Sequence, residues 1–99
     1  MEIISSINNG ITTLSLDGKL DTLTSPKLSV TIEEIAVEAD KITLDFIGVS
    51  YVSSAGLRAL LSAHKLMQKK EGELILVNVN ETVLSVLKMT SFDTILSLR

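Results

Sequence analysis

The pattern of hydrophobic and polar residues predicts short strands that alternate with helices. Two alternating segments, Glu2 to Ile7 and Ile11 to Asp17, flank an Asn8-Asn9-Gly10 turn and predict a β-hairpin at the start of the chain. Two further segments, Lys41 to Phe46 and Glu73 to Val79, are short and apolar and are also expected to be strands. The second of them is almost continuously apolar, as a central strand covered on both faces would be.

Helical periodicity occurs in three segments that follow the hairpin. The Ser25-Pro26 pair predicts a helix start, with serine as the N-cap and proline as the first helical residue. A wide apolar stripe predicts a second helix over Ala55 to Lys70, a third helix is expected over Glu81 to Met89 beginning from Asn80, and a last strand over Thr94 to Leu98. This order predicts an α/β fold, a single domain over residues 1–99 with a mixed, mostly parallel sheet, an N-terminal hairpin and three to four flanking helices.

Composition narrows the class of protein. The 99 residues suit one domain, and the absence of cysteine removes disulfides, zinc–thiolate sites, iron–sulfur clusters and a cysteine nucleophile. The net charge of −3 should repel polyanions, so no direct nucleic-acid partner is expected. Mean hydropathy is +0.40, but the chain lacks a run of about 18 to 20 apolar residues, so we expect no membrane span. The start of the chain lacks the features of a signal peptide, and we expect a cytoplasmic protein.

Residues able to perform catalysis are few. The only histidine, His64, falls within the predicted second helix and is more readily explained as a packed or surface residue than as a catalytic base or metal ligand. Asp17, Asp21 and Asp45 lie near strand ends, but nothing in the sequence pairs them at a metal site. No phosphate-binding loop, nucleophile elbow or zinc-protease motif occurs. We therefore expect no enzyme activity, no cofactor and no metal.

The segment Gly48 to Arg58 is expected to be a loop that leads from a strand into the second helix. Two adjacent hydroxyls, Ser53 and Ser54, stand just before that helix. One of them is expected to be the N-cap, a role worth about 1 kcal/mol. Alternatively, a hydroxyl at the carboxyl edge of a central strand is accessible to another protein, and a phosphate there would face the positive end of a helix.

Three segments carry a resemblance to a known family. Asp45 to Leu61 (DFIGVSYVSSAGLRALL) closely resembles the signature of bacterial anti-sigma factor antagonists, which belong to the STAS-domain family. Gly18 to Thr24 is similar to the Gly-x-Leu-Asp segment of that family, and Gly72 to Val79 is similar to the strand that follows its second helix. With the expected third helix, the resemblance covers essentially the whole chain and implies a mixed sheet flanked by helices.

The resemblance also implies a function and a set of site residues. The family's phosphoacceptor serine corresponds to Ser54, with Ser53, where many members have Asp, as the alternative. The unmodified protein would bind an anti-sigma factor that is also a serine kinase and so free a sigma factor, and a PP2C-type phosphatase would restore the active form. The partner-binding residues would be Asp21, Thr22, Ser53, Ser54, Gly56, Leu57 and Arg58. The alternative is a STAS interaction subunit that is never phosphorylated and acts as a scaffold in a signalling or lipid-transport assembly.

A phosphate in this segment would change the charge of the whole domain. It adds about −1.5 to −2 at neutral pH, so the net charge would move from −3 to about −5. Arg58, Lys65 and Lys69 share one stripe of the predicted second helix. This stripe either lines the same partner surface or is an ordinary solvated face, and the sequence leaves both interpretations open.

Overall fold

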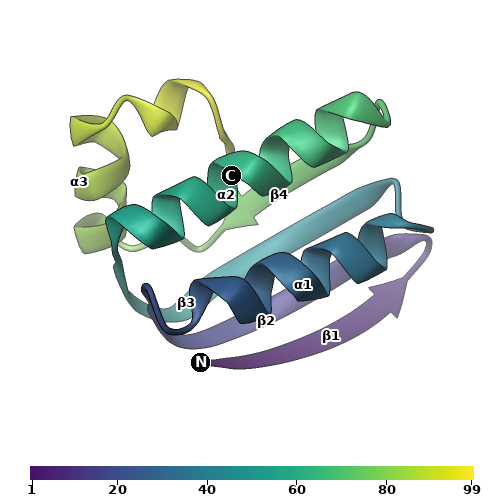
Figure 1. The fold of residues 1–99 in the computed structure, drawn as a ribbon, viewed down its shortest axis with the longest axis horizontal. Helices are drawn as coiled ribbons and strands as arrows, with labels where there is room; N and C mark the ends of the chain where they lie inside the picture. Colours follow the sequence, from purple (N-terminus) through teal and green to yellow (C-terminus); the bar gives the residue numbers. More distant parts are fainter.

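A five-stranded sheet forms the centre of the protein in a computed structural model that describes residues 1–99 (Figure 1). The strands are β1 (Glu2–Asn8), β2 (Ile11–Leu20), β3 (Lys41–Val52), β4 (Glu73–Val77) and β5 (Ser97–Leu98). They lie side by side in chain order, with β1 antiparallel to β2 and every other neighbouring pair parallel. The predicted N-terminal hairpin and the mixed, mostly parallel sheet are therefore confirmed.

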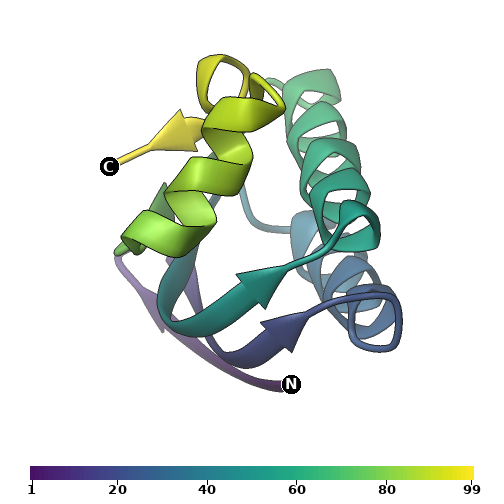
Figure 2. The same cartoon turned by 90° about the vertical axis from the view of Figure 1, so that its left-hand side faces the viewer.

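Three α-helices and one 3-10 turn complete the fold. Helices α1 (Ser25–Ala36) and α2 (Ser54–Lys69) lie side by side on one face of the sheet (Figure 1). Helix α3 (Glu81–Met89) follows β4 and lies across the end of the sheet, where it contacts β3 and the 3-10 turn η1 (Phe92–Thr94) (Figure 2). The predicted fold class is confirmed, with three helices and the short 3-10 turn around a single core.

The core lies between the sheet and the helices α1 and α2. Strand residues that alternate along β2, β3 and β4 point toward α1 and α2, as a half-buried sheet face requires. The innermost residues of this core are fully buried and include Leu14, Leu44, Phe46, Leu60 and Leu76. None of the helices has the length and apolar character that a membrane-crossing helix requires.

Strands β2 and β3 are longer than the sequence pattern predicts. Their pairing continues past Asp17 and Phe46, so the segment Gly48 to Val52, expected to be loop, is strand. The register shifts between Ser15 and Asp17 and again between Gly18 and Lys19, which lets the two strands stay paired across an irregularity. A Cβ at Gly48 would lie 2.8 Å from the Leu16 carbonyl oxygen, so glycine is required at this close approach.

Several predicted element ends are also corrected. Ser25 is the first residue of α1 rather than its N-cap, and Thr24, which precedes it, makes no side-chain capping bond. Strand β4 ends at Val77 because Asn78 adopts a left-handed conformation with φ of +57°, which cannot continue a strand. The last strand is shortened to Ser97–Leu98, because η1 occupies the start of the predicted segment.

Candidate functional site

Two loops meet where β2 and β3 end at their carboxyl edges. Leu20, the last residue of β2, is paired with Val52, the last residue of β3. The pairing extends one step further, because the Ser53 N–H donates to the Leu20 carbonyl oxygen at 2.9 Å. The β2–α1 turn and the first turn of α2 are therefore held next to each other, at the edge where α/β folds expose their binding sites.

Asp21 organises the β2–α1 turn from within. Its Oδ1 accepts hydrogen bonds from the backbone N–H groups of Leu23 at 3.0 Å and Thr24 at 3.1 Å. The Ser25 hydroxyl donates to the Asp21 carbonyl oxygen. The hydrogen bonds donated to the carboxylate, that of the Thr24 N–H first among them, hold the pKa of Asp21 below its usual value of 3.8. The carboxylate of this expected partner-binding residue is thus engaged in shaping the turn.

The first turn of α2 separates the roles of the two serines. Ser53 is the N-cap, and its Oγ accepts a hydrogen bond from the Gly56 N–H at 3.2 Å. Ser54 is the first helical residue, it is exposed, and its hydroxyl makes no hydrogen bond within the protein. The question of which serine caps the helix is therefore answered in favour of Ser53. Serine and aspartate are both good N-caps, so Ser53 can perform the same capping as an aspartate at this position.

Two of the expected partner-binding residues are buried beneath the surface instead of lying on it. A Cβ at Gly56 would lie only 2.6 Å from the Leu20 carbonyl oxygen, so glycine is required for α2 to pack against the end of β2. Leu57 belongs to the hydrophobic core. Gly56 and Leu57 therefore fix the position of α2, while Thr22, Ser54 and Arg58 are the exposed members of the expected set.

Two exposed hydrophobic residues near these loops were not among the predicted site residues. Leu23 is 88% exposed at the centre of the β2–α1 turn, and the hydrogen bond from its N–H to Asp21 fixes its backbone. Tyr51, 47% exposed, lies on β3 beside Lys19. The only feature of the sequence that could have indicated the exposure of Leu23 is its position between two threonines in a polar turn. Leu23 thus offers an exposed apolar side chain on a hydrogen-bonded turn, and Tyr51 an aromatic side chain of the kind enriched at protein interfaces.

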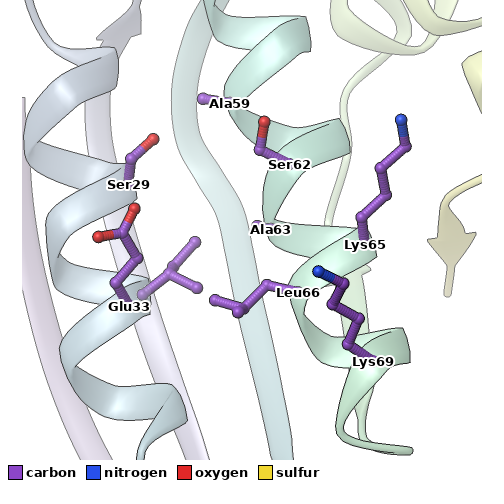
Figure 3. A pocket seen from close by; sticks show the side chains of 9 residues that line it. Ser29, Glu33, Ala59, Ser62, Ala63, Lys65, Leu66 and Lys69 are labelled. Carbon is purple, nitrogen blue, oxygen red and sulfur yellow. The ribbon is translucent and has the colours of Figure 1, made fainter.

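The basic residues of α2 do not gather around Ser54. Arg58 lies one turn along the helix from Ser54, whereas Lys65 and Lys69 lie about 16 to 22 Å from Ser54 along the helix axis. Both lysines are among the residues that line a groove of about 420 Å³ between α1 and α2, with Glu33 on the α1 side. Figure 3 shows the Lys69 side chain turned toward the groove and that of Lys65 pointing away from α1. None of the three basic residues forms an ion pair. Only Arg58 is therefore positioned to interact with a charge on Ser54.

The other residues that could take part in catalysis or metal binding lie apart from one another. His64 is half-buried on α2, and no group of three or more histidine or acidic side chains lies close enough together to hold a metal ion. Asp45 is committed to local structure, because its Oδ1 accepts from the Ile47 N–H at 3.1 Å and from the Asn78 amide at 2.9 Å. The arrangement can present a hydroxyl and two loops to another protein.

Comparison with known proteins places this fold and site in a family. The family model described as the STAS domain matches residues 2–99. The chain belongs to the STAS-domain family. One relative of this STAS domain is the anti-sigma-B factor antagonist of Listeria monocytogenes, 26% identical over 83 residues, which cover 83% of this chain and 73% of the relative.

Solved structures show that the fold is shared. A candidate anti-sigma factor antagonist from Thermotoga maritima superposes with a TM-score of 0.91 at 21% identity, covering 97% of this chain and 84% of that one. The Bacillus cell fate determinant SpoIIAA in its phosphorylated form has a TM-score of 0.76 at 17% identity, covering 99% and 91% of the two chains. The architecture of this STAS domain is therefore that of proteins described as anti-sigma factor antagonists.

Proposed function

We propose that this STAS domain is an anti-sigma factor antagonist whose binding to its partner is switched by phosphorylation of Ser54. The observation that carries the proposal is the free, exposed hydroxyl of Ser54 at the start of α2, beside the hydrogen-bonded β2–α1 turn. The name of the Listeria relative and the phosphorylated form of SpoIIAA support the same function.

The unmodified domain binds an anti-sigma factor that is also a serine kinase, and this binding frees the sigma factor. The contact surface consists of exposed groups from both loops, Thr22, Leu23, Ser54 and Arg58. Leu23 supplies an apolar contact and Arg58 a charged one. Because the turn is fixed by Asp21 before binding, little conformational entropy is lost when the partner docks.

Phosphorylation of Ser54 weakens this contact without unfolding the domain. The phosphate lies at the N-terminus of α2, where free N–H groups and the helix dipole favour negative charge, and Arg58 is one turn away. The fold therefore tolerates the modification. A partner surface that fits against a neutral hydroxyl must instead desolvate a group of charge about −2, and each 1.4 kcal/mol of cost lowers the affinity about tenfold.

A PP2C-type phosphatase removes the phosphate and restores binding. Ser54 is the better acceptor of the two serines, because the Ser53 hydroxyl is already occupied as the N-cap of α2 and is half-buried. Modification of Ser53 would replace the hydroxyl that caps α2, whereas modification of Ser54 leaves it in place.

Phosphorylation is tested with the cognate anti-sigma kinase, magnesium and ATP, followed by mass spectrometry of the digested protein. We expect one phosphate on Ser54 in the wild type and in Ser53→Ala, and none in Ser54→Ala. Binding of the kinase without any phosphate on Ser54 or Ser53 would overturn the switch and support the unmodified scaffold instead.

Calorimetry tests the effect of charge on binding. Ser54→Asp should weaken the affinity for the anti-sigma factor by about tenfold or more, while Ser54→Ala should bind like the wild type. Ser62→Asp is the matched control, because Ser62 is exposed on the same helix about two turns further on. Equal losses for Ser54→Asp and Ser62→Asp would show that net charge, rather than charge at this loop, governs binding.

A further inference from the structure

Strand β1 forms an open edge of the sheet (Figure 1). It pairs only with β2 and does so without a bulge, so the hydrogen-bonding groups on its outer side have no partner strand. Edge strands are usually protected by lysine, proline, a bulge or a covering element, and the sequence EIISSIN contains neither lysine nor proline. Ile4 is 58% exposed and Ile7 77% exposed on this strand. A further strand can therefore add to this edge.

A groove of about 610 Å³ flanks the same edge, between β1 and the C-terminal half of α1. Its apolar lining includes Ile7, Ile35 and Val37, and Val37 is 79% exposed. The end of β1 thus lacks the helix cover that the central strands have (Figure 1). A strand added to β1 would extend the sheet below this groove and fill it with its own side chains.

The sequence of β1 is complementary to itself in the antiparallel orientation. A two-fold axis through Ser5 places the two copies of this serine opposite each other. The other facing pairs are then Ile3 with Ile7, Ile4 with Ser6, and Glu2 with Asn8. No like charges meet, and the isoleucine pairs lie on the helix side of the sheet, because Ile3 is opposite the core residue Leu16.

The charges on α1 and in the turn after it are placed to pair across the same two-fold axis. Lys27 lies at the start of β1, where its Nζ donates to the Met1 carbonyl oxygen at 3.2 Å. Glu34 and Glu38 lie at the other end of the strand, in the groove beside Ile7. None of these three residues has an ion-pair partner within the chain. Antiparallel pairing of β1 strands brings each Lys27 toward the acidic end of the other copy's α1.

We infer that the β1 edge and the adjoining flank of α1 form a docking surface for a second copy of this chain. The two sheets join through antiparallel β1 strands, and Ile7 and Val37 become buried. The interface is closed by its two-fold symmetry, so it forms dimers and not fibres. Ser54 follows β3, away from the β1 edge, so each dimer presents two accessible Ser54 sites. The inference goes beyond the proposed switch and stands independently of it.

Disulfide trapping tests this geometry directly, since the chain has no cysteine. Facing residues in antiparallel strands have Cα atoms about 4.5 to 5.5 Å apart, within the range that a disulfide spans. Ser5→Cys should therefore oxidise to a covalent dimer in the otherwise unchanged chain. Ser85→Cys, exposed on α3, is the control and should remain monomeric. Oxidation of Ser5→Cys no faster than Ser85→Cys would overturn the inference.

Analytical ultracentrifugation of the cysteine-free protein at micromolar to millimolar concentration provides the second measurement. The wild type should pass from monomer to dimer, and Ser5→Lys, which sets two like charges opposite each other, should raise the dissociation constant by about tenfold or more. Lys27→Glu and Glu38→Lys should each weaken the dimer, and combining them should restore it. The two-fold pairing would be contradicted if the wild type stayed monomeric or formed larger, open-ended assemblies. It would also be contradicted if the double variant dimerised as weakly as either single variant.

Discussion

A single carboxylate determines the shape of the β2–α1 turn. Asp21 accepts hydrogen bonds from the N–H groups of Leu23 and Thr24, and these bonds fix the backbone that carries the exposed Leu23. The same donors favour the charged form of the carboxylate, which lowers the pKa of Asp21 in the folded protein. The pKa therefore reports on whether the turn is formed.

This shift makes the contribution of Asp21 to stability dependent on pH. Because the folded pKa lies below the unfolded value of 3.8, the contribution is complete well above pH 3.8 and is lost as the pH falls through the folded pKa. The difference in unfolding free energy between the wild type and Asp21→Ala should therefore shrink as the pH is lowered from neutrality past 3.8. Urea denaturation at a series of pH values measures it.

Asp21→Asn serves as the control for this experiment. Its amide oxygen can still accept hydrogen bonds from the turn but does not titrate, so Asp21→Asn compared with Asp21→Ala should show a difference that is independent of pH. A wild-type advantage that stays constant down to the most acidic conditions would contradict the role given to the ionised carboxylate.

At the scale of the element, the start of α2 separates a structural hydroxyl from a free one. Ser53 satisfies the Gly56 N–H, one of the donors that a helix leaves unpaired in its first turn. Ser54 contributes no such bond. The helix therefore keeps its N-terminus when Ser54 is modified, which is what a phosphorylation switch that leaves the fold intact requires.

Substitutions in these two serines should have unequal effects on stability. Ser53→Ala should lower the free energy of unfolding by about 0.5 to 2 kcal/mol, and Ser53→Asp should retain most of it because aspartate also caps helices. Ser54→Ala should remain within about 0.5 kcal/mol of the wild type, as an exposed substitution without partners. Urea denaturation ranks the variants, and a larger loss in Ser54→Ala than in Ser53→Ala would reverse the assignment of the cap.

The existence of each α-helix and strand could be predicted from the sequence, but not the 3-10 turn η1 or where β2 and β3 end. Gly18 and Gly48 read as breaks between elements, whereas both lie within strands, at an irregularity that depends on how β2 and β3 pair. The start of α2 could be recognised from its two serines. The burial of Gly56 could not, because it depends on contact with Leu20, which is distant in sequence. Local patterns identify elements, while contacts between elements decide their ends.

At the scale of the whole molecule, both long helices lie on one face of the sheet and must be held against each other (Figure 1). Part of this attachment is made by Lys70, just after α2. Its Nζ donates to the carbonyl oxygens of Ala36 and Ala39, the latter at 2.8 Å, and lies 3.7 Å from Asp40. Ala36 is the last residue of α1, whose final carbonyl groups have no partner within the helix, and Ala39 lies in the turn that follows it. A cation there also opposes the negative end of the helix dipole.

Lys70→Met should therefore destabilise the protein through α1 and not only through α2. Methionine keeps the length of the side chain but cannot donate, so the free energy of unfolding should fall by about 1 to 3 kcal/mol. The neighbouring Lys69 is exposed and unpaired, so Lys69→Met should stay within about 0.5 kcal/mol of the wild type. Hydrogen exchange followed by mass spectrometry should show faster exchange in the last turn of α1 in Lys70→Met alone. Glu34 lies on α1 and Glu38 in the turn after it, both beside the β1 edge, so loosening this end of the helix should weaken the proposed dimer as well. Equal behaviour of Lys70→Met and Lys69→Met would mean that core packing alone holds the two helices together.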